Sequence, residues 1–200
     1  PEPIVRLDPD SELAAEIEQV RSEIERLSGR QPTDEEIAAE LAAWERTLAE
    51  ERRAQQWVTL DPQQWDSEHG ATLTKLADRS LLSSGDRPEI DTYTVQADTD
   101  MQGITAIRLQ LLTDDRLPHG GPGRHESGNP VLSEFSVSAA PKGERSGFEP
   151  LAIAQATAHF NQSGWDAAQA IDGDATTGWA VYPRIGAAHL AVFELEEDVS

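Results

Sequence analysis

The spacing of apolar residues changes near Trp57, and this change most constrains the fold. Before it, apolar residues recur at intervals of three and four, as in Leu13, Ile17, Val20, Ile24 and Leu27. After it they alternate with polar residues, as in Ile107, Leu109 and Leu111. Intervals of three and four place side chains on one stripe of a helix, whereas alternation places them on one face of a strand. The sequence therefore predicts a helical part over 1–56 and a mainly β part over 57–200.

The helical part has the signals of two helices joined by a short turn. Gly29 is suited to ending the first helix, and Thr33 with Glu36 matches a capping box that begins the second. The second apolar stripe consists of Ile37, Leu41, Trp44 and Leu48. A connection as short as 28–32 makes the helices antiparallel neighbours. We expect an antiparallel α-helical hairpin that acts as a coiled-coil-like spacer, the alternative being a docking arm.

The β part contains short alternating runs separated by polar, turn-rich loops. These runs lie at 72–76, 92–97, 107–111, 135–137 and 191–195. Many short strands with long loops are typical of an antiparallel sandwich rather than of alternating strands and helices. The sequence therefore predicts a mainly β fold, an antiparallel jelly-roll β-sandwich. Because the chain stops just after a strand-like run, at Val199-Ser200, we expect a fragment whose sandwich is truncated at its C-terminus.

The charge and composition exclude several classes of function. The chain has 16 Lys and Arg against 37 Asp and Glu, a net charge of −21, which repels nucleic acid and anionic membrane surfaces. No apolar run approaches the roughly 20 residues that membrane insertion needs. The absence of Cys excludes disulfides, thiolate metal sites and c-type haem attachment within these residues.

The sequence offers little support for an enzyme. The sequence lacks a Gly-x-Ser-x-Gly elbow, a His-Glu-x-x-His helix and a phosphate-binding Gly-Lys-Ser/Thr loop. Its five His show no close ligand spacing. With 37 acidic residues a carboxylate pair can always be found, so such a pair carries no information. We therefore expect no catalytic residues and no enzyme activity in this chain.

The sharpest local motif is the turn Asp172-Gly173-Asp174 with Thr177 shortly after it. Calcium binds roughly six to eight oxygen ligands, which come from carboxylates, hydroxyls and backbone carbonyls in a flexible geometry. These residues are able to wrap such ligands around a cation, although Asp-Gly-Asp is also a common turn that needs no ion. The positions of Gly and Glu do not match an EF-hand.

Six side chains are candidates for contacting a sugar. The Gly-rich loop 118–130 offers hydrogen-bonding groups on His119, Arg124, His125 and Asn129. Loops at one end of a sandwich are where binding groups collect. Two aromatic residues with flat faces for stacking on a pyranose ring are Trp165 and Tyr182. The alternatives are an ordered connection whose Arg124 pairs with a carboxylate, and aromatic rings that are buried.

The run 156–179 resembles the signature of discoidin (coagulation factor type C) and galactose-binding-like sandwiches. The residues that carry this resemblance are Phe160, Trp165, the stretch 170–174, Thr177 and Trp179. It implies a structural Ca²⁺ held by the side chains of Asp172 and Thr177 and by the carbonyls of Ala170, Asp174 and Thr177. It also implies a further acidic ligand from a closing C-terminal strand, and Trp179 in the core.

A wider resemblance covers most of the chain. The matching stretches are 40–45, 57–60, 70–76, 91–95, 103–109, 120–124 and 128–135. They are similar to the large planctomycete-type cytochrome c proteins, which flank such a segment with domains of unknown function. The resemblance implies an extracytoplasmic location, periplasmic, at the cell surface or secreted, and no haem within this segment.

Together these features predict a non-catalytic carbohydrate-binding or adhesion module of a larger extracytoplasmic protein, with a structural calcium site. Its expected partners are a polysaccharide or glycan and the neighbouring domains of the same chain. The alternative is an architectural interdomain sandwich of a multidomain cytochrome c-type, electron-transfer protein, with no ligand of its own.

Overall fold

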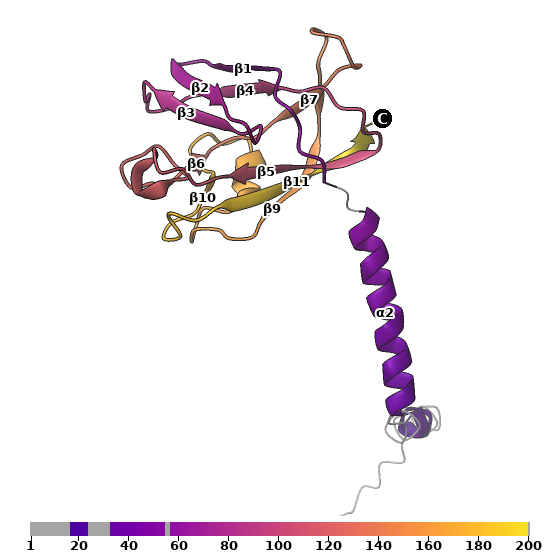
Figure 1. Cartoon of the computed structure of the whole chain (residues 1–200). Helices are drawn as coiled ribbons and strands as arrows, with labels where there is room; N and C mark the ends of the chain where they lie inside the picture. Colours follow the sequence, from indigo (N-terminus) through magenta and orange to yellow (C-terminus); the bar gives the residue numbers. More distant parts are fainter. Residues whose placement is uncertain (1–16, 24–32, 55–56, 200) are drawn as a thin grey trace, which may run out of the picture. The chain divides into compact units, whose positions relative to one another are not determined.

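The chain divides into two compact units, Pro1–Val58 and Thr59–Ser200. The computed structural model describes residues 17–23, 33–54 and 57–199 (Figure 1). The sequence prediction places the boundary between residues 56 and 57.

In the first unit, the described secondary structure is entirely helical. Residues 17–23 are helical, and α2 spans Asp34–Ala54. The predicted capping box is present, because Thr33 Oγ1 accepts from the Glu36 N–H at 3.2 Å and Glu36 Oε2 accepts from the Thr33 N–H at 2.9 Å. These two bonds satisfy backbone donors that a helix start leaves unpaired.

The predicted hairpin depends on residues 24–32, which include Gly29 and lie outside the described residues. Antiparallel pairing of the two helices therefore remains a prediction. The stripe on α2 is exposed at Ile37, Leu41 and Trp44, by 49%, 51% and 59%. In the described part of the chain, no helix is both long enough and apolar enough to cross a bilayer.

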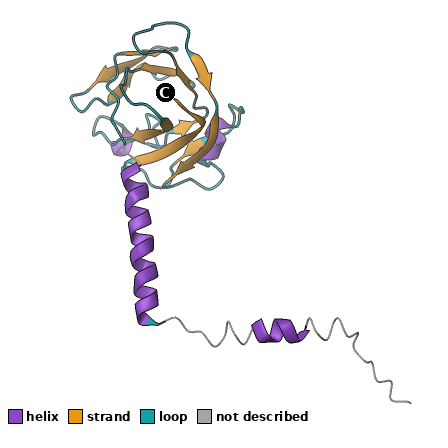
Figure 2. Ribbon diagram, turned by 90° about the vertical axis from the view of Figure 1, so that its right-hand side faces the viewer, coloured by secondary structure: helices purple, strands orange, loops and turns teal. Residues whose placement is uncertain are grey.

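The second unit is built from short antiparallel strands separated by long loops (Figure 2). The strands are β1 Gln64–Ser67, β2 Ala71–Lys75, β3 Leu81–Gly85, β4 Tyr93–Gln96, β5 Ile104–Leu111, β6 Val131–Leu132, β7 Val137–Ala139, β8 Glu149–Leu151, β9 Ile153–Ala158, β10 Trp179–Ala180 and β11 His189–Val199. Two 3₁₀ helices interrupt the loops, η1 Pro118–Gly120 and η2 Ala167–Ile171. The predicted mainly β, antiparallel class is confirmed.

A three-stranded sheet in the order β5-β11-β9 is the largest sheet among the described residues of this unit. Phe193 on β11 lies opposite Ile107 on one side and Ala156 on the other. The remaining strands form two-stranded pairs, which are β1 with β4, β2 with β3, β6 with β10, and β7 with β8. Burial alternates along β11, where His189, Ala191 and Phe193 are buried and the residues between them are half-buried. This is the two-residue period of a strand, which turns alternate side chains to one face.

The core lies against this sheet. Its largest fully buried side chains are Trp179, Val181 and Phe193. Phe135 stacks on Phe193 with ring centroids 3.8 Å apart. Trp179, which is fully buried, donates from Nε1 to the Phe160 carbonyl at 3.0 Å, so its one polar group is satisfied. The prediction that Trp179 belongs to the core is confirmed.

Candidate functional site

The loop after η2 is organised by its own carboxylates. Asp172 Oδ1 accepts from the Asp174 N–H at 2.8 Å, and Asp174 Oδ1 accepts from the Thr176 N–H at 2.9 Å. Thr176 also donates from its hydroxyl to Asp174 at 2.7 Å, and these two bonds from Thr176 lower the pKa of the Asp174 carboxyl. The predicted turn is therefore a chain of local hydrogen bonds, as Asp residues commonly form.

Thr177 is the point where the oxygens of this loop converge. Its hydroxyl lies 2.8 Å from Asp172 Oδ2 and 3.0 Å from the Asp174 carbonyl oxygen. The Gln169 carbonyl oxygen lies 3.4 Å from the same hydroxyl. The carbonyls that the resemblance implies are those of Ala170, Asp174 and Thr177, so Gln169 is an addition from the structure.

This donor set fits a hard cation in kind. It consists entirely of oxygens and includes one carboxylate, the ligands that calcium prefers. The Ala170 carbonyl, which the resemblance also implies, accepts a 2.7 Å hydrogen bond from the Phe135 N–H and so joins the loop to the core. Within the described residues, no three His, Asp or Glu side chains converge as a metal cluster. A cation here would depend on hydroxyl and carbonyl ligands.

The end of the loop is fixed by close packing at Gly178. Its φ of 152° lies in a region that residues with a Cβ rarely adopt, and a Cβ there would lie 2.4 Å from the Leu132 carbonyl oxygen. Gly178 thus lets the chain pass directly beside β6 before Trp179 enters the core.

The six predicted sugar-contacting residues differ in their burial and in the hydrogen bonds that they make. Asn129 is used internally: its Nδ2 donates to Gln162 Oε1 at 3.0 Å and its Oδ1 accepts from the Val181 N–H at 3.1 Å. A ligand would have to break these bonds, which tie the loop 118–130 to the segment around β10. Asn129 therefore has a structural use in this fold.

The other predicted residues have different environments. His125 is exposed, with its Nδ1 2.8 Å from the Ser127 hydroxyl. His119 is exposed within η1 and adopts a left-handed φ of 55°. Trp165 is half-buried, and its ring is therefore only partly available for stacking. Tyr182 is 57% exposed.

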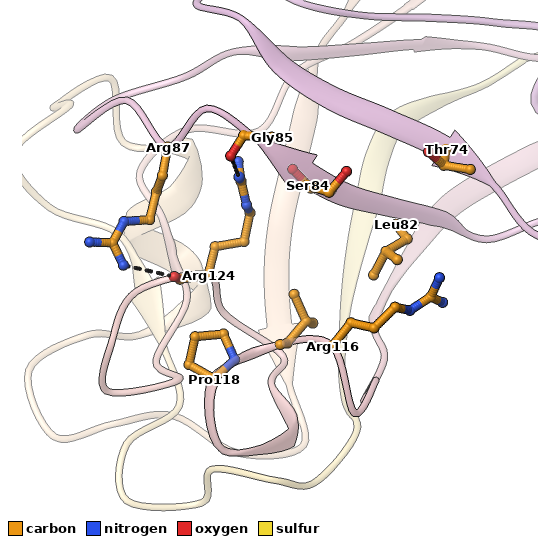
Figure 3. Close-up of a pocket in the computed structure, with 10 residues that line it drawn as sticks. Thr74, Leu82, Ser84, Gly85, Arg87, Arg116, Pro118 and Arg124 are labelled. Atoms are coloured by element: carbon orange, nitrogen blue, oxygen red, sulfur yellow. Dashed lines mark hydrogen bonds between the residues drawn. The ribbon is translucent and has the colours of Figure 1, made fainter.

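Arg124 lines a pocket in the second unit. The pocket has a volume of about 450 Å³ and lies between β3 and the segment 116–124. Its lining residues are Thr74, Leu82, Ser83, Ser84, Gly85, Arg87, Arg116, Leu117, Pro118 and Arg124. Figure 3 shows β3 above the pocket, Arg116 and Pro118 below it, and Arg124 reaching from the loop toward Gly85.

Hydrogen bonds hold two of the arginines in place. Arg124 donates from its guanidinium to the Gly85 carbonyl at 2.8 Å. Arg87 donates to the Arg124 carbonyl at 3.1 Å and lies 3.5 Å from Glu126. The predicted alternative, Arg124 paired with a carboxylate, is not seen among the described residues, where its partner is a backbone carbonyl.

The third arginine, Arg116, is held by Asp114. Its Nε and one terminal nitrogen each donate to that carboxylate at 2.7 Å. The guanidinium, together with the Arg116 N–H, lowers the pKa of Asp114 from 3.8 to about 2. These two bonds to one carboxylate fix the orientation of the planar Arg116 guanidinium.

The sequence analysis missed most of this pocket. Arg87 and Arg116 stand in turn-rich stretches with no motif around them, and the hydroxyl residues lie on an ordinary strand. The one sequence feature that points to these residues is that Lys and Arg are scarce in an acidic chain. That scarcity does not show which of the basic residues lie together in the folded protein.

Comparison with known proteins finds no matching family model, no matching curated protein and no matching solved structure. The resemblances described above rest on the quoted stretches and remain predictions.

Proposed function

We propose that residues 59–199 are a non-catalytic glycan-binding module, and that the pocket below β3 holds the sugar. We also propose that these residues fold as a galactose-binding-like jelly-roll sandwich. Antiparallel strands, a three-stranded β5-β11-β9 sheet and long loops are compatible with that architecture. The proposed setting is a larger extracytoplasmic protein, as the resemblance implies.

The observation that carries the proposal is the chemistry of the pocket lining. Ser84 and Thr74 offer hydroxyls, and Arg124 offers guanidinium donors, beside the apolar side chains of Leu82 and Leu117. A sugar ring presents hydroxyls at its edge and C–H groups on its faces, so it matches a wall of this mixed kind. The volume of about 450 Å³ falls within the range of small-molecule sites.

The same lining supports binding without catalysis. Among the described residues that form the pocket wall, none is Asp, Glu or His. Glycoside hydrolysis commonly needs two carboxyl groups facing the scissile bond, and general acid–base chemistry commonly uses His or a carboxyl. A wall of arginines, hydroxyls and apolar groups is suited to holding a sugar.

Calcium has a structural role in this proposal. The ligands would be the side chains of Asp172 and Thr177 and the Asp174 carbonyl, with the Ala170 or Gln169 carbonyl beside them. An ion bound there would hold the loop in one conformation, as a cross-link between its ends. The Thr177 hydroxyl already links Asp172 to the Asp174 carbonyl. Binding of an ion would therefore cost the loop little further conformational entropy.

Blocking the pocket tests the proposal. Ser84 is an exposed residue on β3 that lines the pocket, so Ser84→Trp would fill the space without disturbing the core. The matched control is Ser84→Ala, which leaves the pocket open. We expect wild type and Ser84→Ala to bind members of a panel of neutral and acidic oligosaccharides by calorimetry, and Ser84→Trp to lose that binding.

Two results would contradict the proposal. Binding that survives Ser84→Trp unchanged would place the sugar elsewhere on the chain. Absence of binding by the folded wild type across the panel would overturn the glycan-binding function and favour the architectural alternative.

A further inference from the structure

The pocket below β3 gathers positive charge in a strongly acidic protein. The chain carries a net charge of −21. Its second unit has nine basic residues, which are Lys75, Arg79, Arg87, Arg108, Arg116, Arg124, Lys142, Arg145 and Arg184. Three of the nine line this one pocket, and among its described lining residues there is no carboxylate.

We infer that the ligand of this pocket carries an oxyanion, a carboxylate or a sulfate ester, and that Arg124 binds it. The inference rests on the proposed glycan-binding function and names the chemical class of the sugar. Guanidinium groups bind carboxylate and sulfate oxygens through paired N–H donors, whereas a neutral sugar gives them no charge to neutralise.

Arg124 is the arginine best prepared for this contact. Its guanidinium has five N–H donors. Within the described residues it makes one hydrogen bond, 2.8 Å to the Gly85 carbonyl, and it has no ion-pair partner. The side chain is half-buried, so Gly85 fixes its direction while its positive charge stays uncompensated by a carboxylate. A partly desolvated, oriented and unpaired cation favours an anionic ligand.

Arg87 and Arg116 lie on opposite sides of the pocket (Figure 3). Each is held from outside the lining by a carboxylate, Arg87 by Glu126 at 3.5 Å and Arg116 by Asp114 at 2.7 Å. These carboxylates offset the charges of Arg87 and Arg116 and so limit the repulsion among three like charges. The positive charge of the pocket that no carboxylate offsets among the described residues is therefore that of Arg124.

The acidic surroundings also limit the kind of anion. At physiological ionic strength charges are screened beyond roughly 8 Å, so the pocket arginines act at short range. A long polyanion would place many of its charges against the rest of a protein of net charge −21. The ligand that fits best is a sugar with a single uronate or sulfate group, at a chain end or at wide spacing.

Calorimetry with three matched sugars tests the inference. The probes are a neutral galactose disaccharide, the same disaccharide with one sulfate ester, and a disaccharide that ends in galacturonate. We expect wild type to bind at least one charged probe about 10-fold or more tightly than the neutral one. The comparison of sulfate with galacturonate identifies the source of the oxyanion.

The variants are Arg124→Gln, Arg124→Lys and the control Arg145→Gln. Arg145 lies outside the pocket, paired with Asp98 at 3.3 Å, and its replacement removes the same charge from the same unit. We expect Arg124→Gln to lose the preference for the charged probe, Arg124→Lys to retain part of it, and Arg145→Gln to retain all of it. Thermal melts verify that each variant is folded.

The outcomes separate this inference from the proposed function. Equal affinity for neutral and charged probes, still abolished by Ser84→Trp, would overturn the oxyanion and leave the glycan site standing. A charge preference that persists in folded Arg124→Gln would also overturn the inference. If none of the probes or the panel sugars binds, both proposals fail.

Discussion

Thr177 donates a hydrogen bond of 2.8 Å from its hydroxyl to Oδ2 of Asp172, five residues earlier in the chain. The bond closes the loop that follows η2 and brings a carboxylate oxygen, a hydroxyl and the Asp174 carbonyl oxygen to one place. Three oxygens at one point form the start of a cation site or the closure of a turn. The two roles differ in their response to calcium.

Two substitutions of equal charge distinguish these roles. Asp172→Asn removes the side-chain carboxylate that we propose as a ligand. Asp174→Asn also removes a carboxylate, but it keeps the backbone carbonyl of residue 174, which is the only group of that residue proposed to bind. We expect saturable calcium binding in wild type and Asp174→Asn and none in Asp172→Asn, measured by calorimetry. In binding-competent proteins, calcium at about 100 times Kd should raise the free energy of unfolding by about 2.7 kcal/mol.

The calcium proposal has a clear failure condition. Equal calcium affinity in Asp172→Asn and Asp174→Asn would show that the ion is attracted by the overall negative charge of the protein and has no specific site at Thr177. No binding by wild type would leave Thr177 as the closure of a turn.

Trp179 should be a principal contributor to the stability of the second unit. Trp179→Phe removes the donor to the Phe160 carbonyl and leaves space in the core. Losing one partner of a buried hydrogen bond costs about 1–3 kcal/mol. The control Tyr182→Phe changes a 57% exposed ring and should stay within about 0.5 kcal/mol of wild type. Urea denaturation monitored by circular dichroism measures both, and equal stability of the two variants would contradict this assignment.

Asn129 is expected to act as an anchor of the loop 118–130. Asn129→Ala breaks bonds to Gln162 and Val181, so we expect a loss of about 1–3 kcal/mol in the free energy of unfolding. Limited proteolysis should also cut this loop faster. His125→Ala, at an exposed position in the same loop, serves as the control. Unchanged stability and cleavage in Asn129→Ala would show that the loop is held by other contacts.

The Asp114–Arg116 pair predicts a pH dependence with a definite sign. Because the pKa of Asp114 falls from 3.8 to about 2 on folding, the ionised form is favoured in the native state. Its stabilising effect is complete above the unfolded pKa and is lost as the pH falls toward about 2. We expect Asp114→Asn to lower Tm at pH 6, and the difference from wild type to shrink below about pH 4.

The adjacent Asp115 provides the control for this measurement. Asp115→Asn removes the same charge one residue away, and within the described residues Asp115 has no ion-pair partner. A Tm difference for Asp114→Asn that stays constant from pH 6 down to acid would contradict the assigned role of the pair.

Local sequence patterns determined much of the coarse architecture. The Thr33–Glu36 capping box, the alternation along β11 and the burial of Trp179 all follow from residues close together in the chain. Helix caps, strand period and the preference of a large aromatic for the interior are local or single-residue properties. They can therefore be read without knowing which segments will meet.

Tertiary structure alone decided the pairing and the pocket. Phe193 meets both Ile107 and Ala156 because β11 lies between β5 and β9, which no local pattern specifies. Likewise, Ser84 and Arg124 come from separate segments and share a pocket once β3 lies over the loop. The physical reason is that long-range register depends on how the whole core packs, whereas residue spacing reports only on the nearest neighbours.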